Sequence, residues 1–276
     1  MNQNKYSATW VSHSSISDFL NCHRAYYLKN VYKDPKTNHK INIINPSLAL
    51  GQAVHDVLES MSSVKAENRF KESLLSKYEN IWQKVSGKSG GFKDINQEQE
   101  YKDRGKKMIQ RVIDNPGPLL NKAIKIKQDL PYYYLSKEEN IILCGKVDWL
   151  EYISKDDTVH VIDFKTGKQD KDLKSLQLLI YYLLIENCQK RKVSKVSYWY
   201  LDTNNAPTEL ELVNLNKAHN KIFEIARKIK LLRKTRMYNC KHKGCFHCLP
   251  FESIVNNKAE YVGIGNYNQD IYIINK

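Results

Sequence analysis

The segment 161–167, with the sequence VIDFKTG, places a carboxylate and an ammonium two residues apart at the end of an apolar run. Residues two apart in a strand share a face, so Asp163 and Lys165 point to one side, opposite Ile162 and Phe164. Carboxylate oxygens bind Mg²⁺, and a neighbouring lysine can orient water or stabilise the charge that develops during phosphodiester hydrolysis. A surface ion pair is the alternative interpretation of so short a motif.

A second carboxylate, Asp148, follows Gly145 in the preceding predicted strand, which covers residues 141–153. The polar turn at residues 154–157 predicts a hairpin between this strand and the one at 159–165. Pairing in that hairpin would bring Asp148 alongside Asp163. The sequence therefore predicts a catalytic centre of Asp148, Asp163 and Lys165.

Two predicted helices carry further polar residues that could complete this site. Gln177 and Tyr181 lie four apart, and hence on one face, in a helix predicted over 173–186. They are candidates for contact with the scissile phosphate or an adjacent base, although Tyr181 could equally be a core residue. His55, in a helix predicted over 47–62, could bind the cation, although a lone histidine on a partly apolar helix is more often a core residue.

The order of the predicted elements favours a mixed α/β domain with a helical N-terminal part. Apolar spacing predicts a first helix that starts near Ser14 or Ser15 and runs to about residue 28. Further helices are expected at 47–62, 66–85, 97–114, 173–186 and 217–234. Strands are expected at 123–135, 141–153, 159–165, 193–201, 209–213 and 270–274.

The bulk composition fits a folded protein that meets a polyanion. The chain has 276 residues, 41% of them hydrophobic, and 44 Lys and Arg against 30 Asp and Glu, for a net charge of +14. This surplus favours nucleic acid as a partner, although a lysine-rich and asparagine-rich composition could also produce it. The last long helix carries basic residues that could form a phosphate track or a solvated face: Lys217, Lys221, Arg227, Lys228 and Lys230.

Nothing in the sequence indicates a membrane segment. The first ten residues have no apolar signal core, and the longest strongly apolar stretch, 176–185, is too short to span a bilayer. We therefore expect a cytoplasmic protein without membrane contact.

Three of the six cysteines, Cys240, Cys245 and Cys248, lie close together near the C-terminal end. In a reducing compartment such a group more often binds metal than forms disulfides. Residues 245–248 form a compact knuckle with His247 inside it and His242 nearby, which would suit zinc. The remaining cysteines Cys144 and Cys188 lie in apolar settings and are predicted to be buried.

Four motifs, in this order, resemble the nuclease domain of the RecB family within the PD-(D/E)XK superfamily, which includes AddB and the CRISPR-associated exonucleases. The motifs are Gly51-x-x-x-His55, Gly145-x-Val147-Asp148, Asp163-x-Lys165-Thr166-Gly167 and Gln177-x-x-x-Tyr181. The opening residues Ser15-Ile16-x-x-Phe19-x-x-Cys22-x-x-x-Tyr26 also resemble the start of those domains. The resemblance covers residues 12–250.

The resemblance implies a restriction-endonuclease-like fold, with a mixed sheet core flanked by helices. One nuclease domain would span residues 1–276. It would consist of a mainly helical N-terminal part at 12–122, a nuclease core at 123–235 and a cysteine-bearing, metal-stapled tail at 236–276.

The resemblance also implies a role for each motif residue. His55, Asp148, Asp163 and the backbone carbonyl of Phe164 would hold Mg²⁺ or Mn²⁺, with Lys165 as the catalytic lysine and Gln177 and Tyr181 as DNA-binding residues. Members of the family cut DNA, often from ends, so single-stranded or end-containing duplex DNA is the expected substrate. The expected setting is repair, recombination or foreign-DNA processing, and a helicase partner would have to be a separate chain. The alternatives are a non-cleaving module that binds DNA or a helicase, and RNA as substrate.

Several RecB-family nucleases tie their two ends together with an iron–sulfur cluster, and Cys22 with Cys240, Cys245 and Cys248 resembles that ligand plan. The resemblance implies a four-iron four-sulfur cluster held by four thiolates. The gaps of four and then two residues between the last three cysteines differ from the usual family spacing. Zinc therefore remains the alternative metal.

Overall fold

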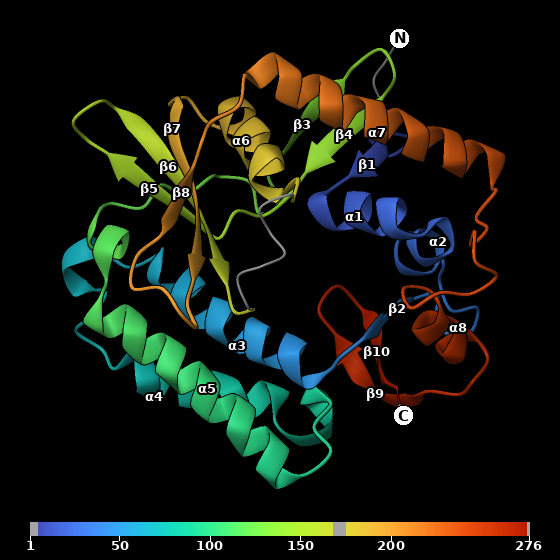
Figure 1. Cartoon of the computed structure of the whole chain (residues 1–276), viewed down its shortest axis with the longest axis horizontal. Coiled ribbons are helices and arrows are strands. Elements are labelled where there is room, and N and C mark those ends of the chain that lie inside the picture. Colours follow the sequence, from blue (N-terminus) through green and yellow to red (C-terminus); the bar gives the residue numbers. More distant parts are fainter. Residues whose placement is uncertain (1–4, 168–174, 275–276) are drawn as a thin grey trace.

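The computed structural model describes residues 5–167 and 175–274 as a mixed α/β structure (Figure 1). Its helices are α1 (His13–Asn21), α2 (His23–Asn30), α3 (Pro46–Met61), α4 (Leu74–Trp82), α5 (Ile95–Asp114), α6 (Gln177–Cys188), α7 (Leu215–Thr235) and α8 (Leu249–Val255). Short 3₁₀ helices η1–η4 cover Ala66–Asn68, Gln83–Val85, Gly87–Gly90 and Gly117–Leu120. The strands are β1 (Thr9–Val11), β2 (Lys40–Ile43), β3 (Tyr132–Ser136), β4 (Ile141–Cys144), β5 (Trp149–Ile153), β6 (Thr158–Lys165), β7 (Val193–Tyr200), β8 (Thr208–Leu210), β9 (Glu260–Gly265) and β10 (Gln269–Ile273).

The central sheet has the strand order β5-β6-β7-β8 and is mixed, because β6 runs antiparallel to β5 but parallel to β7. One face packs against α6 and α7, with Val161 and Tyr198 among the buried residues. The other face packs against α3, α4 and α5, where Phe164 and Trp199 lie in the core. Helices on both faces bury this sheet, which explains why residues 159–164 of β6 are all buried.

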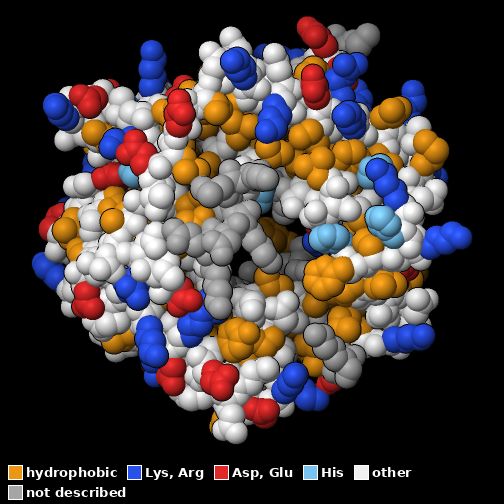
Figure 2. Space-filling view, viewed as in Figure 1, with side chains coloured by type: hydrophobic (Ala, Val, Ile, Leu, Met, Phe, Trp, Pro, Cys, Tyr) orange, Lys and Arg blue, Asp and Glu red, His pale blue; other side chains and the backbone are white. Residues whose placement is uncertain are grey.

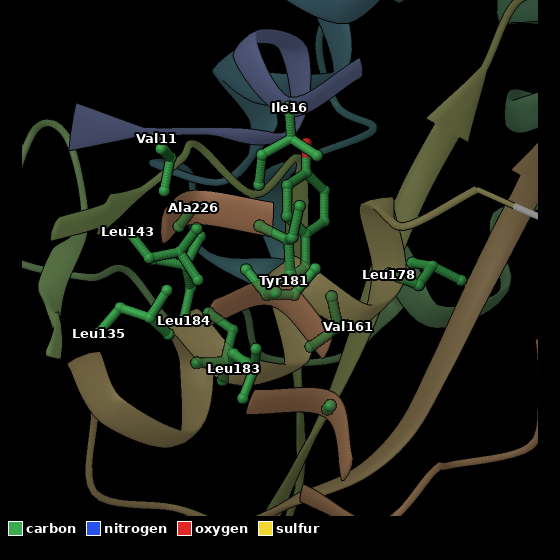
Figure 3. Packing of buried hydrophobic residues seen from close by; sticks show 14 of the residues in the cluster. Val11, Ile16, Leu135, Leu143, Val161, Leu178, Tyr181, Leu183, Leu184 and Ala226 are labelled. Carbon is green, nitrogen blue, oxygen red and sulfur yellow. The ribbon is translucent and has the colours of Figure 1, made fainter. Parts of the chain in front are cut away.

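A smaller sheet, β1-β4-β3, extends the core that α6 fills (Figure 3). Val11 from β1 and Leu143 from β4 lie in the same buried cluster as Leu184 from α6 and Ala226 from α7. The N-terminal strand is therefore held against α6 and α7 by burial of apolar side chains as well as by its pairing with β4.

A third sheet, β2-β10-β9, joins segments from near the two ends of the chain. Strand β10 pairs in parallel with β2 and antiparallel with β9. A separate buried cluster lies beside this sheet and includes Leu28, Ile41, Phe251 and Ile254. The predicted tail is thus packed onto the N-terminal part of the chain.

Several predicted elements are correct and others are broken or shorter. Helices α3, α5 and α7 and strands β6 and β7 match their predictions closely. Of the helix predicted over 173–186, the first two residues lie outside the described residues. The helix predicted from residue 13 to 28 breaks at Cys22, whose φ of −165° is extended, and Ser12 rather than Ser14 or Ser15 caps its start.

The helix predicted over 66–85 begins only at Leu74. The buried guanidinium of Arg69 donates to the carbonyls of Met61 and Leu119, at 3.1 and 2.6 Å, and holds this stretch as a turn. Spacing of apolar residues gave no sign of that interaction.

The strands predicted over 123–135 and 141–153 were too long. The first is a strand only over Tyr132–Ser136, with an isolated bridge at Ala123. The second divides into β4 and β5, which belong to different sheets, so residues 145–148 link two sheets instead of continuing a strand. Strands β1, β2 and β9 were not predicted. Strands β1 and β2 are short and pair with strands that are distant in sequence, whereas β9 forms a hairpin with the neighbouring β10. Over the described residues, no helix combines the length and the apolar character needed to cross a bilayer.

Candidate active site and cysteine cluster

Strand β6 sorts its last residues onto opposite faces, as the sequence predicts. Phe164 packs into the cluster against α3–α5, whereas Asp163 and Lys165 face α6. The Asp163 side chain is 1% exposed and that of Lys165 is 18% exposed. Lys165 Nζ lies 2.8 Å from Asp163 Oδ2, close enough for an ion pair although not aligned for a hydrogen bond.

Asp148 lies immediately before β5, at the same end of the sheet. The β5–β6 register pairs Trp149 with Ile162, and Asp148 Oδ2 accepts a hydrogen bond from the Phe164 backbone N–H at 2.9 Å. The predicted proximity of Asp148 to the Asp163 strand end is therefore present, even though Asp148 is not in a strand.

Helix α3 brings His55 to the same place. His55 Nδ1 lies 3.4 Å from Asp148 Oδ2, and its ring is edge-on to Phe164 at 6.3 Å between centroids. One turn earlier, a Cβ added to Gly51 would lie only 3.3 Å from the Thr166 hydroxyl oxygen. A side chain at this position would therefore require the Thr166 hydroxyl to shift slightly.

Helix α6 supplies Gln177, whose amide joins several members of the site. Its Nε2 donates to Asp163 Oδ1 at 2.7 Å and to the Tyr181 hydroxyl at 3.0 Å, while its Oε1 accepts from Lys165 Nζ at 2.5 Å. Tyr181 is 7% exposed and packs in the core, so only its hydroxyl belongs to the site. Tyr181 is therefore a core residue, and its contact with a phosphate or base stays a prediction.

Burial and charge shape the protonation of the site. Burial, together with the negative charge of Asp148, raises the pKa of Asp163 to about 7, although Lys165 opposes both effects. Burial also disfavours the charged form of His55, but its hydrogen bond to Asp148 and the charges of both aspartates outweigh that effect and raise the pKa of His55. The raised pKa of Asp163 means that protonation of this carboxyl reduces the negative charge at the strand end near pH 7.

The donor types suit a hard divalent cation, because two carboxylates, a carbonyl and an imidazole can coordinate one ion. The buried Asp163 Oδ2 accepts no hydrogen bond, which leaves a lone pair for a cation. Within the described ranges, however, the only group of three or more His, Cys, Asp or Glu ligand atoms mutually within 4.8 Å is made of cysteines. Binding of one ion by His55, Asp148 and Asp163 would therefore require these side chains to move closer together.

Two residues around the site were not singled out from the sequence. Arg104 of α5 donates to the Thr166 carbonyl at 2.8 Å and pairs with Asp202, which fixes the chain as it leaves β6. The Tyr198 ring lies under Lys165, with 4.9 Å between Nζ and the ring centroid. Tyr198 could have been found from the pairing of β6 with β7, which places it opposite Asp163, whereas no local signal marks Arg104.

The cysteine cluster forms as the sequence predicts. Cys22, at the break between α1 and α2, meets Cys240, Cys245 and Cys248, and their sulfur atoms lie within 4.8 Å of one another. The pKa of the Cys240 thiol is lowered to about 7, chiefly by a hydrogen bond from the backbone of His242. Four converging thiols are a suitable ligand set for a metal. His242 and His247 are not members of this group.

The other two cysteines differ from each other. Cys144 is buried, and its thiol donates to the Val11 carbonyl at 3.5 Å, as expected for a small core residue. Cys188 is only half-buried, so the prediction of a buried side chain was wrong for it.

The basic helix α7 uses part of its charge within the protein. Arg227 and Lys230 both pair with Glu139, at 2.8 and 3.7 Å. Lys217, Lys221 and Lys228 are exposed. Their surface charges can attract a polyanion, but the pairing of the other two favours a structural role for that part of the helix.

A mixed sheet with helices on both faces carries two aspartates and a lysine near the ends of adjacent strands, an arrangement that suits a nuclease. The chain belongs to the PD-(D/E)XK nuclease superfamily, whose family model matches residues 10–252. Comparison with curated proteins gave no match.

Proposed function

We propose that this protein is a Mg²⁺- or Mn²⁺-dependent deoxyribonuclease with Asp148, Asp163 and Lys165 as its catalytic residues. The observation that carries this proposal is the 2.8 Å approach of Lys165 Nζ to Asp163 Oδ2 at the strand end to which Asp148 is hydrogen-bonded. The superfamily membership supports a nuclease, and the retained lysine and acidic residues argue against a decayed, non-cleaving relative.

In this proposal His55, Asp148, Asp163 and the Phe164 carbonyl would hold the divalent cation, which would supply Lewis acidity for phosphodiester hydrolysis. Water oxygen would form a bond to phosphorus and release one proton to solvent, the bond from phosphorus to the leaving oxygen would break, and that oxygen would take up one proton. The Lys165 ammonium is placed to donate to a phosphoryl oxygen as negative charge develops on it. Gln177 orients Lys165 and Asp163, and the Tyr181 hydroxyl orients Gln177.

The four-cysteine cluster is proposed to hold a four-iron four-sulfur cluster, with zinc as the alternative. Its ligands come from the α1–α2 break and the tail, and Arg24 of α2 also forms an ion pair with Glu252 of α8. Either metal would have a structural role, because it would add to the apolar cluster, the Arg24–Glu252 ion pair and the β2–β10 pairing that already join these segments.

DNA is the proposed substrate, and exonucleolytic processing in repair, recombination or foreign-DNA removal is the proposed setting. The net charge of +14 supports a polyanionic partner. A helicase, if one acts with the protein, is proposed to be a separate chain. The second candidate, a module that binds DNA or a helicase without cutting, keeps the same fold but predicts no cleavage.

The test is cleavage of end-labelled single- and double-stranded DNA by anaerobically purified protein, with matched RNA substrates beside it. Mg²⁺, Mn²⁺ and EDTA are compared, and Lys165→Ala is run in parallel. Metal-dependent DNA cutting that disappears in the variant is expected. Intact DNA in every condition, together with retained DNA binding, would favour the non-cleaving module.

A further inference from the structure

Two adjoining hollows lead away from the candidate active site. The first, of about 400 Å³, is lined by Asp148 and Val147 and extends along residues 124–131. The second, of about 800 Å³, is lined by residues 37–40 and by the turn of the β9–β10 hairpin. Asp129 and Tyr267 line both hollows, so together they form one groove that starts at an active-site carboxylate.

Tyr267 stands at the tip of the β9–β10 hairpin in an unusual conformation. Its φ is +59°, that of the next residue, Asn268, is +53°, and the Tyr267 side chain is 91% exposed. Glycine or asparagine suits left-handed turn positions, whereas a tyrosine there is strained and exposes its ring to water. The fold gains nothing evident from this residue, and strain of this kind is a reason to look for a function.

Strand pairing and polar contacts hold the base of the β9–β10 hairpin in place. Strand β10 pairs with β2, and the buried Asp270 accepts from the Thr37 hydroxyl at 2.6 Å and lies 2.9 Å from His39 Nδ1. Lys88 forms an ion pair of 2.6 Å with Glu260 at the start of β9. These contacts fix the direction of the hairpin, and in Figure 1 its turn points toward the middle of the view, where Figure 2 shows a hollowed surface.

The far hollow also gathers positive charge. Lys33 and Lys40 line it, and the positive charge of Arg233 acts on Lys40. Burial and then the charges of Arg233 and Lys33 lower the pKa of Lys40, which shows that cations surround it. Asp129 is the one acidic residue among the described lining of this hollow. Such a site suits the phosphates of a nucleic-acid strand.

We propose that this groove binds the single-stranded DNA that flanks the scissile phosphate, with Tyr267 stacking on one base and Lys33 and Lys40 contacting phosphates beyond it. The proposal rests on the nuclease function proposed above and adds a residue outside the matched family region, because the hairpin follows residue 252. Exposed aromatic rings stack on bases without regard to sequence, so Tyr267 would strengthen binding of any single strand.

The first test measures binding of a fluorescent oligothymidylate about 20 nucleotides long, longer than the stretch that one such groove covers. Binding is measured in EDTA in the Lys165→Ala background, so that no cleavage occurs. Tyr267→Asn keeps a residue suited to the turn but removes the ring, Tyr267→Phe keeps the ring, and Ile264→Ala removes another exposed apolar side chain of the hairpin that lines neither hollow. We expect about tenfold weaker binding for Tyr267→Asn, and unchanged binding for the other two variants.

The lysines are tested through the salt dependence of the same binding. Affinity for DNA falls as salt rises, so the slope of log affinity against log salt is negative. The double variant Lys33→Gln and Lys40→Gln should make this slope shallower by about 1.4, since each phosphate contact on a single strand contributes about 0.7. Tyr267→Asn should leave that slope unchanged, because stacking releases no counterions. Equal binding by Tyr267→Asn and its parent, with an unchanged slope for the lysine variant, would overturn the proposal.

A third measurement separates failure of this proposal from failure of the proposed nuclease. In the active Lys165 protein, Ile264→Ala should cleave a thymidine dinucleotide and a long oligonucleotide at the parental rates, whereas Tyr267→Asn should cut subsaturating long oligonucleotides about tenfold more slowly. If the parent cleaves neither substrate, the nuclease assignment fails, while the binding measurements still decide whether the groove holds DNA. If both substrates are cut equally well by variant and parent, the role of Tyr267 is refuted and the nuclease stands.

Discussion

Gln177, the first residue of α6, donates a hydrogen bond of 2.7 Å to Asp163 and so connects α6 to the end of strand β6. Its carbonyl oxygen also accepts from Lys165, so one uncharged amide connects the carboxylate with the ammonium. An amide can do both, because it carries a donor and an acceptor on one planar group. The arrangement makes Gln177 a positioning residue that can be tested independently of the charged pair.

Gln177→Ala should lower kcat by about 10–100-fold with a small effect on KM, because loss of an orienting hydrogen bond displaces the acting groups. The variant is compared with Gln110→Ala, which alters an exposed glutamine of α5 that bonds only to Asp114 in its own helix. Steady-state kinetics on single-stranded DNA at several metal concentrations provide the measurement. A Gln177→Ala enzyme with parental kcat would show that Lys165 and Asp163 hold their geometry unaided.

Lys165→Ala should lower kcat by at least about 10²–10³-fold, the loss typical when one donor to the developing charge is removed. Lys195→Ala is the matched control, because Lys195 lies on the adjacent strand β7 and pairs at the surface with Glu209 at 3.1 Å. Thermal unfolding of both variants checks that each is folded. Comparable losses in the two variants would point to a general charge effect on DNA binding.

The buried Asp163 carboxylate should make the metal-free protein less stable as pH rises. Its pKa, near 3.8 when unperturbed, is raised to about 7 by burial and by Asp148, so between these pH values the folded state binds more protons than the unfolded state. Stability in chelator is therefore highest below about pH 4 for this group and is lost as pH rises toward 7.

Asp163→Asn should remove this loss and make the chelated protein more stable than the parent by about 1–3 kcal/mol at pH 8, part of the gain being offset by the lost partner of Lys165. Asp156→Asn, in the exposed turn between β5 and β6, is the control. Urea unfolding at pH 5 and pH 8 in EDTA measures both. A parental stability profile in Asp163→Asn would mean that Lys165 and Gln177 already compensate the buried charge.

Cys22→Ser should release most of the metal bound by the cysteine cluster and lower Tm by about 5–10 °C. In a chain of this size, each kcal/mol of lost unfolding free energy lowers Tm by about 2–4 °C. Cys188→Ser, which alters a half-buried cysteine outside the cluster, should keep both metal content and Tm. Elemental analysis for iron and zinc, with visible absorption spectra, identifies the metal. Unchanged metal content in Cys22→Ser would exclude that cysteine as a ligand.

The sequence by itself determined features that depend on neighbours in the chain. Alternation along a strand was enough to place Asp163 and Lys165 on one face, and a spacing of four was enough to place Gln177 beside Tyr181. Both relationships follow from the fixed geometry of strands and helices, which does not depend on the rest of the fold. The resemblance to RecB-family nucleases further predicted that Cys22 lies close to the tail cysteines. No local periodicity in the sequence indicates that contact.

Only the tertiary structure decided relationships between distant segments. Asp148 reaches the strand end from a link between two sheets, because pairing of Trp149 with Ile162 fixes where that link lies. Arg69 breaks a predicted helix because its guanidinium satisfies carbonyls from another segment. Tyr267 meets the groove only because β10 pairs with β2. Partners of this kind are selected by packing and hydrogen bonding over the whole chain, and these interactions leave no periodic trace in the sequence.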